Sequence, residues 1–283
     1  MSPKEAWAMA RRAISAWNDD YAPSMGAALS YYTLFSIAPL LLIVLAIAGL
    51  LFGEEAARGE LYGELASLIG PSGAQAVQEL VAHANRPAAG ITALAMGSVA
   101  LFLGASAVFG ELQNTLDRIW RAPAAKQQSG WMNILRSRLL SFGMILAVAF
   151  VLMVSLVLSA VLGALGKWWA LDLAASLAVT TLLFALVYKI IPRVRIRWSD
   201  VWLGAAVTAA LFAVGKVLIG LYLGRSSVAS TFGAAGSLVV FMVWVYYSAQ
   251  VFLLGAEFTR VYAARIRACE KAPSASSPRT SAA

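Results

Sequence analysis

Polar side chains recur at helical spacing inside the apolar stretch 26–42. At 100° per residue they fall within an arc of about 160°, and they are Ser30, Tyr32, Thr33 and Ser36. In hydrocarbon such a face must point toward other helices or a water-filled cavity, because an unsatisfied hydroxyl group is costly there. The pattern therefore indicates either hydrogen bonding between helices or the wall of a polar pathway, and both interpretations remain open.

A seam of small residues leads to two polar side chains, Glu111 and Asn114. Gly97, Ala100, Gly104 and Ala107 precede them at alternating spacings of three and four, so all six lie along one line of a helix. Small residues permit the close approach of a second helix. Glu111 and Asn114 then either line a polar pathway or are merely solvated near a helix end.

A second polar stripe occurs near the end of the last apolar segment. It spans about 60° of a helical wheel and consists of the polar residues Tyr246, Gln250 and Glu257 together with Leu253. Glu257 lies near the inner end and has Arg260 as a simple ion-pair partner. Gln250 lies near the middle of the segment, where a side-chain amide needs a hydrogen-bond partner.

Lys216 is the one charged residue deep inside an apolar segment. It is the sixteenth residue of the segment 201–224, about 12 Å below the outer end at 1.5 Å per residue. It shares a helical face with Ala205, Ala209 and Gly220, small residues typical of a packed interior face. Snorkelling to the outer headgroups is the simpler interpretation, whereas an inward-facing lysine predicts an anion site.

The chain that carries these residues has a composition that excludes a soluble domain. Of its residues 60% are hydrophobic and only 13% are charged, far from the averages of soluble proteins. Six apolar stretches have the length, about 20 residues, that crosses a hydrocarbon core as a helix; they are 27–52, 89–110, 139–166, 173–191, 201–224 and 237–259. The sequence predicts an all-α polytopic membrane protein with six transmembrane helices.

Positive charge is distributed unevenly between the two sides of this predicted membrane domain. One side holds seventeen of the 22 lysines and arginines and the other side holds four, with Lys216 inside a span. By the positive-inside rule both termini lie in the cytoplasm, and an even number of spans agrees with this. The net charge of +8 is therefore a topology signal, and no nucleic-acid partner is expected. We predict a multi-pass protein of the bacterial inner membrane.

Three regions are predicted along the chain. Residues 1–22 form an amphipathic helix at the membrane interface, with aromatic residues on one face and basic residues on the other. Residues 23–262 form the transmembrane domain, in which the acidic segment 53–88 folds as an outer helical hairpin. Residues 263–283 form a cytoplasmic tail that is polar, contains proline and is expected to be largely disordered.

The sequence offers no group suited to hydrolysis. His83 is the only histidine and lies in the predicted outer segment, and Cys269 is the only cysteine. Metal-assisted phosphodiester hydrolysis needs converging histidine and carboxylate ligands. We therefore expect no catalytic residue, no metal and no cofactor, and we do not expect an enzyme. No nucleotide-binding loop is visible, so any transport is passive, ion-coupled or powered by another protein.

Three blocks together resemble the YihY/BrkB family of bacterial inner-membrane proteins, once labelled ribonuclease BN. The blocks are 24-SMGAALSYYTLFSIAPLLL-42, 104-GASAVFGELQNTLDRIW-120 and the run from 188-YKIIPRVRIRW-198 to 244-WVYYSAQVFLLGAEF-258. The family's tyrosine-glycine pair before the last span is Phe232-Gly233 here. The resemblance covers most of residues 20–262. It implies six membrane helices with both ends in the cytoplasm, a link to envelope integrity and, from proposals made for relatives, movement of lipids.

These features favour a transporter or flippase-like pathway for an amphipathic anion, such as a phospholipid or a lipid A precursor. The expected substrate-binding residues are Lys216, Tyr246, Gln250, Tyr32, Ser30, Thr33, Ser36, Glu111, Asn114 and Glu257. A non-catalytic scaffold for envelope integrity or assembly is the alternative, and a ribonuclease is less favoured. Membrane lipids are the expected partners, while a homo-oligomer and envelope-assembly proteins remain open.

Cysteine labelling tests the predicted topology. In a chain without Cys269, a cysteine in place of Ser72 should react with a membrane-impermeant thiol reagent in intact cells, because the segment 53–88 is predicted to lie outside. A cysteine in place of Ser276 should react only after the membrane is permeabilised. Labelling of both positions in intact cells would contradict this topology.

Overall fold

The computed structural model describes residues 3–36, 107–123, 169–194, 196–225 and 236–271, together with scattered positions between 55 and 79. Within these residues all regular secondary structure is helical. The helices are α1 (Pro3–Asp19), α6 (Trp169–Ile190), α7 (Trp198–Arg225) and α9 (Gly236–Lys271), and shorter helical stretches cover 22–36 and 107–119. The all-α class is confirmed for the described part of the chain.

Two of the described helices are long and apolar enough to cross a membrane. They are Trp198–Tyr222 within α7 and Leu238–Ala268 within α9, where the spans 201–224 and 237–259 are predicted. The 36 residues of α9 extend about 54 Å at 1.5 Å per residue, well beyond the roughly 30 Å of a hydrocarbon core. α9 is therefore longer than a membrane crossing requires.

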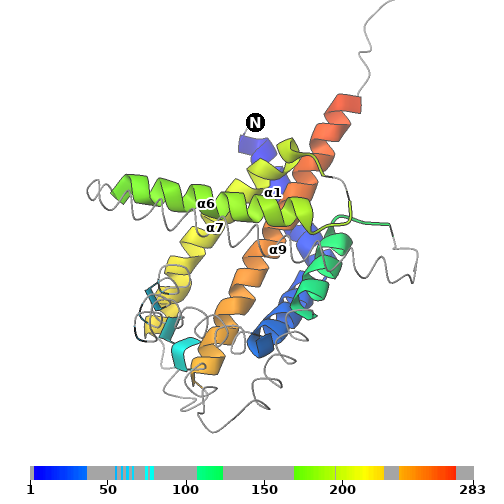
Figure 1. The fold of residues 1–283 in the computed structure, drawn as a ribbon. Coiled ribbons are helices and arrows are strands. Elements are labelled where there is room, and N and C mark those ends of the chain that lie inside the picture. The colour runs from blue at the N-terminus through cyan, green and yellow to red at the C-terminus, as the bar shows by residue number, and fades with distance from the viewer. Residues whose placement is uncertain are drawn as a thin grey trace, which may run out of the picture.

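The count of six spans remains a prediction. The spans 27–52, 89–110 and 139–166 and the outer hairpin 53–88 lie wholly or mostly outside the described residues. The predicted span 173–191 corresponds to α6, whose apolar helix Ala174–Ile190 is shorter than the two above. In Figure 1, α6 runs across α7 and α9 at a steep angle rather than alongside them. Apolar length does not fix helix tilt, which is set by packing against neighbouring helices.

α7 and α9 run antiparallel and meet through a reciprocal contact of glycine and threonine (Figure 1). Thr259 of α9 lies over Gly204 of α7, and Thr208 of α7 lies over Gly255 of α9, in each case so closely that a Cβ on the glycine would not fit. Each threonine hydroxyl donates to the carbonyl oxygen of the glycine four residues earlier in its own helix, at 2.7 Å. Because the hydroxyls are satisfied inside their helices, the two backbones approach without burying an unpaired donor.

Tyr188 anchors the end of α6 on this crossing. Its buried hydroxyl donates to the carbonyl oxygen of Phe252 at 2.7 Å and lies 3.2 Å from the hydroxyl of Thr208. The ring packs against those of Phe184 and Phe252, which also contact each other, in the same apolar core. α6 is therefore fixed to both membrane-crossing helices through one side chain.

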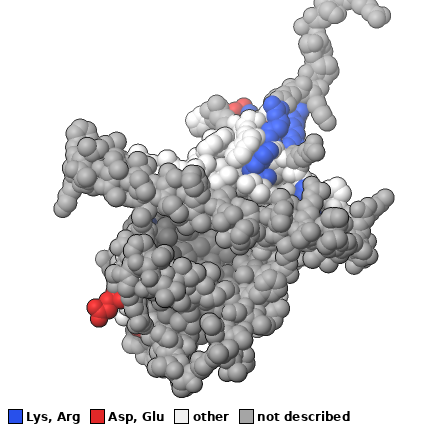
Figure 2. All heavy atoms as spheres, in the orientation of Figure 1, with Lys and Arg blue, Asp and Glu red and all other residues white. Residues whose placement is uncertain are grey.

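The apolar core lies where these helices meet the stretches 22–36 and 107–119. Its buried residues include Met25, Leu29, Leu116, Ile119, Ile196, Val201 and Leu253. This is also where Arg260, Arg265 and Arg267 of α9 lie, and we call it the basic end of the structure. Figure 2 shows lysine and arginine side chains gathered on this part of the surface.

α1 packs on the basic C-terminal part of α9. Met9 and Ala13 are buried, and Arg265 of α9 pairs with Glu5 at 2.9 Å. Trp7 and Ile14, which belong to the predicted aromatic face, are exposed. Trp7 and Ile14 thus do not pack on α9, whereas Trp17 of the same face packs against the apolar core. The location of this face at the membrane interface stays a prediction.

Substitution of the two glycines tests the crossing. Gly204→Ala and Gly255→Ala should each lower the free energy of unfolding by about 1–3 kcal/mol, because the added methyl group must displace a threonine side chain. At Gly204 it also meets the backbone of Thr259, and at Gly255 the hydroxyl of Tyr188. Gly220→Ala is the matched control in α7, because no described atom lies within 4 Å of the added Cβ, and it should be neutral or stabilising by up to about 1 kcal/mol. Thermal unfolding in detergent measures all three, and equal stability of the three variants would refute the packing described.

Candidate functional site

Two turns with left-handed backbone geometry meet at the basic end. After α1 the chain turns through Asp20 and Tyr21 to enter the stretch 22–36, and the helix 107–119 ends in a turn that contains Arg121. Tyr21 has a φ of 59° and Arg121 a φ of 50°, a conformation that costs a non-glycine residue about 1 kcal/mol or more. Such strain persists only where surrounding contacts hold the turn in place.

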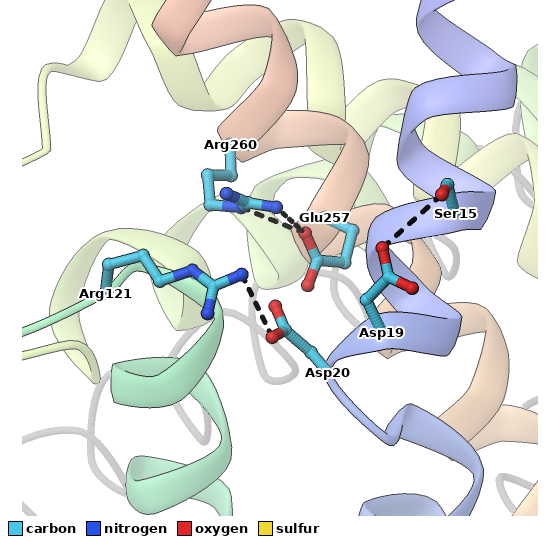
Figure 3. A network of polar contacts seen from close by, with 6 residues as sticks. All are labelled: Ser15, Asp19, Asp20, Arg121, Glu257 and Arg260. Carbon is cyan, nitrogen blue, oxygen red and sulfur yellow. Dashed lines mark hydrogen bonds and ion pairs between the residues drawn. The ribbon is translucent and has the colours of Figure 1, made fainter.

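The contacts that hold these turns form a network of two acids and two arginines (Figure 3). Arg121 Nη2 lies 3.0 Å from Asp20 Oδ1. Arg260 contacts Glu257 Oε2 through Nη2 at 2.8 Å and through Nε at 2.9 Å. The acids are 3% and 0% exposed, and in Figure 3 their carboxyl groups point toward each other. We call Asp20, Arg121, Glu257 and Arg260 the carboxyl cluster.

The carboxyl cluster joins three parts of the chain that are distant in sequence. Asp20 follows α1, Arg121 follows the helix 107–119, and Glu257 and Arg260 belong to α9. Within the described residues no group of three or more His, Cys, Asp and Glu side chains is placed to hold a metal ion. Each acid already contacts a guanidinium group, so the cluster fits a charged joint between segments better than a metal centre.

A second set of contacts clamps the turn after α6 onto the helix 107–119. The backbone N–H of Arg193 donates to Asp117 Oδ1 at 2.7 Å, and its guanidinium donates to Gln113 Oε1 at 3.1 Å. Gln113 Nε2 in turn donates to the carbonyl oxygen of Ile191 at 3.3 Å. The helix that carries Arg121 is thereby fixed to the connection between α6 and α7.

The start of α7 is tied to α9 by another buried acid. Asp200 is completely buried, and its Oδ2 lies 3.4 Å from Arg267 Nη2. Its other oxygen accepts a hydrogen bond from Ser199 Oγ at 3.2 Å. Ion pairs thus connect α7, α9 and the segments on either side of them at the basic end.

Two residues of the predicted stripe on α9 lie against the N-terminal segment. Glu257 pairs with Arg260, which agrees with the simpler interpretation of its sequence position. Gln250 Nε2 donates to the carbonyl oxygen of Pro23 at 3.4 Å, and its amide fills the space over Gly26. The amide therefore finds a backbone partner, as its depth in the segment requires.

The predicted polar face on 22–36 is largely satisfied within its own helix. Ser30 Oγ donates to the carbonyl oxygen of Gly26 at 2.8 Å, and Ser36 Oγ donates to that of Thr33 at 3.1 Å. Both serines are buried, while Tyr32 and Thr33 are half-buried. The two serine hydroxyls are therefore compatible with burial without a bond to another helix.

Lys216 and Tyr246 lie farther from the basic end. Lys216 is half-buried on α7, in the same helical arc as the buried Ala205 and Ala209. Tyr246 is 39% exposed and precedes Glu257 by eleven residues, about 17 Å along α9. The candidate residues on α7 and α9 thus fall into one group at the basic end and another group deeper along the helices.

The other two candidates lie on the less buried side of the helix 107–119. Glu111 is half-buried and Asn114 is exposed, whereas Leu116 and Ile119 on the other side are completely buried. The outer part of the small-residue seam, before residue 107, lies outside the described residues. Any role of Glu111 and Asn114 in binding stays a prediction.

Sequence reasoning missed Asp20 and Arg121 as members of the site. Asp20 falls inside the predicted interfacial helix 1–22, and Arg121 was interpreted only as part of the basic loop charge. The available signal is the acidic pair Asp19-Asp20 directly before an apolar segment. Their pairing depends on two left-handed turns that the residue types Tyr21 and Arg121 do not suggest.

A comparison with protein families gives a match over nearly the whole chain. The family model described as virulence factor BrkB matches residues 13–280. The chain belongs to the BrkB family. The resemblance found in the sequence blocks is thereby confirmed.

Three relatives similar to this chain are described as membrane proteins. A UPF0761 membrane protein of Ralstonia nicotianae is 26% identical over 88% of this chain and 57% of its own length. One of Neisseria meningitidis serogroup B is 27% identical over 90% of this chain and 62% of its own length. One of Tolumonas auensis is 29% identical, with 86% and 81% covered. This BrkB-family chain is therefore an integral membrane protein that spans less than two thirds of the Ralstonia and Neisseria proteins.

No solved structure gives a significant match to this BrkB-family chain. The relatives' names state no substrate or partner. The function is therefore argued from the described residues.

Removal of Arg121 tests the contribution of the carboxyl cluster to stability. Arg121→Met leaves Asp20 buried without its guanidinium, and it should lower the free energy of unfolding by about 1–2 kcal/mol, because the exposure of Arg121 screens part of the pair. Arg265→Met is the control, since it breaks the exposed pair with Glu5 and should cost well under about 1 kcal/mol. Denaturant unfolding in detergent compares the two, and an equal effect would show that the cluster does not hold the segments together.

Proposed function

We propose that this BrkB-family membrane protein is a transporter of an amphipathic anion, such as a phospholipid or a lipid A precursor. In this proposal Lys216 binds the anionic headgroup partway along α7. The single observation that carries the proposal is the placement of a lysine on the inward arc of a membrane-crossing helix.

The packing of α7 supports an inward position for Lys216. Ala205 and Ala209 on the same arc are 0% and 1% exposed, whereas Val214 and Val217, which flank Lys216, are exposed. The flanking valines thus have the exposure of a lipid-facing surface, and Lys216 itself is half-buried. A charged side chain on the interior arc of a span is a functional-site hypothesis by default.

Burial decreases along the arc of α7 that carries Lys216 with distance from the basic end. Ala205 and Ala209, nearer the basic end, are buried. At Gly220, one turn beyond Lys216, no described atom lies within 4 Å of an added Cβ. On α9 the stripe changes from the fully buried Leu253 to the exposed Tyr246. Among the described residues, this arc thus has the room that a headgroup requires.

In this proposal the basic end, by contrast, is the closed side of the pathway. The carboxyl cluster, the clamp at Arg193 and the pair of Asp200 with Arg267 tie every described helix at that end. A transporter needs one side closed while the other admits substrate. We propose that the basic end faces the cytoplasm, with both termini there, as the positive-inside rule favours for the bacterial inner membrane.

Lysine suits recognition of a phosphate headgroup. Its ammonium offers three donors and does not demand a fixed bidentate geometry. A hydrogen bond to a charged group is worth about 1.5–3 kcal/mol, which corresponds to roughly a tenfold to hundredfold change in affinity. Loss of the ammonium should therefore have a measurable effect on an anionic lipid and little effect on a zwitterionic one.

Proteoliposomes test the proposal. Wild type should move a fluorescent anionic phospholipid between leaflets, Lys216→Met should slow this movement about tenfold or more, and Lys216→Arg should retain part of it. Lys4→Met, at an exposed position of α1, controls for the loss of one positive charge and should behave as wild type. If wild type moves no lipid and Lys216→Met binds anionic lipid with wild-type affinity, the transport proposal is wrong and a scaffold is favoured.

A further inference from the structure

The carboxyl groups of Asp20 and Glu257 are buried face to face although 236 residues separate them in the chain. Asp20 Oδ2 and Glu257 Oε1 are both buried, and neither has a hydrogen-bond partner among the described atoms. Figure 3 shows these carboxyl groups pointing at each other between Arg121 and Arg260. A buried polar atom without a partner costs about 1–3 kcal/mol, so two at one place call for a shared explanation.

The arginines fix the orientation of both acids. Arg121 holds Asp20 through Oδ1, and Arg260 holds Glu257 through Oε2. Rotation of either carboxyl group to move its second oxygen away would break the contact with its arginine. The two remaining oxygens are therefore kept facing each other.

One bound proton supplies the hydrogen-bond donor that the two facing carboxyl groups lack. An ionised carboxylate has only acceptor atoms, so two facing carboxylates have no donor between them. One proton on either acid makes that acid a donor and the other an acceptor. Two negative charges that face each other also favour uptake of that proton. No other chemical change is needed, because the proton comes from water and no bond other than O–H forms.

The other charged groups near Asp20 and Glu257 come from α1, from α9 and from the helix 107–119 with the turn that follows it. Arg121 follows the helix 107–119 and Arg260 lies on α9, and each favours one negative charge. Asp19 points to Ser15 within α1. Arg118 lies over the ring of Tyr21, 5.6 Å from its centre. The arginines contact the outer oxygens only and supply no donor to the facing pair.

We propose that Asp20 and Glu257 together form a binding site for one exchangeable proton that links the N-terminal segment to α9 at the basic end. With the proton bound, the two acids hold the segments together. Without it, two negative oxygens repel each other across the same joint. The site stands on the geometry of this cluster and does not depend on the transport proposal.

The two isosteric amides mimic the protonated state. In Asp20→Asn the new Oδ1 accepts from Arg121 and the new Nδ2 donates to Glu257. In Glu257→Gln the new Oε1 accepts from Arg260 and the new Nε2 donates to Asp20. Each variant supplies the missing donor permanently, so each is expected to fold and to be insensitive to the proton.

Infrared spectroscopy detects the proton directly. Purified full-length protein in detergent should show the carbonyl stretch of a protonated carboxyl group, shifted in deuterated water, and this band should disappear as the pH is raised. Both Asp20→Asn and Glu257→Gln should lack the band, whereas Glu5→Gln, at the exposed pair with Arg265, should keep it. A spectrum without the band at any pH at which the protein is folded, or a band that both amide variants retain, would overturn the proposal.

Thermal unfolding against pH gives a second readout that needs no lipid. The midpoint temperature of wild-type unfolding should fall over the pH range in which the infrared band disappears, because the folded state then loses the proton that joins its two segments. Both amide variants should show a flatter profile with a higher midpoint than wild type at alkaline pH. Parallel profiles for wild type and both variants would refute the site. Because no transport is measured, this result is separate from the outcome for Lys216.

Discussion

The close crossing of α7 and α9 is the constraint on which the rest of the structure depends. Gly204 and Gly255 each accept the threonine of the opposite helix, and each threonine hydroxyl is bonded within its own helix. In a membrane, where helix association relies on packing, such small-residue contacts set how near two backbones can come. Tyr188 reaches both helices only because they are this close, so the position of α6 follows from the same contact.

Charged residues surround this crossing at the basic end of the structure. Asp200 of α7 meets Arg267 of α9. The N-terminal segment is attached to α9 by the carboxyl cluster, whose Glu257 and Arg260 lie next to Thr259, and by the Glu5–Arg265 pair, six residues beyond Thr259. Buried ion pairs contribute little net stability compared with apolar packing. Their value here is that they specify which segments meet, and a pair that can gain or lose a proton makes that joint adjustable.

Sequence periodicity predicted the faces of helices better than the contacts between them. The arc of Lys216 with Ala205 and Ala209, the need of Gln250 for a partner and the pairing of Glu257 with Arg260 all follow from helical geometry and local spacing. Asp20 and Arg121 could not be assigned in this way, because their meeting depends on left-handed turns and on distant segments. The crossing angle of α6 could not be predicted either, because hydropathy indicates the length of a membrane helix and not its tilt.

The central claim is that the helices are closed at the basic end and admit an amphipathic anion beside Lys216. A density map of the protein in native lipid tests this claim most directly. The account predicts an elongated density with its headgroup at the ammonium of Lys216 and beside Tyr246, above an intact carboxyl cluster. A map in which side chains fill that space and lipid lies only on the outer surface of α7 and α9 would contradict it.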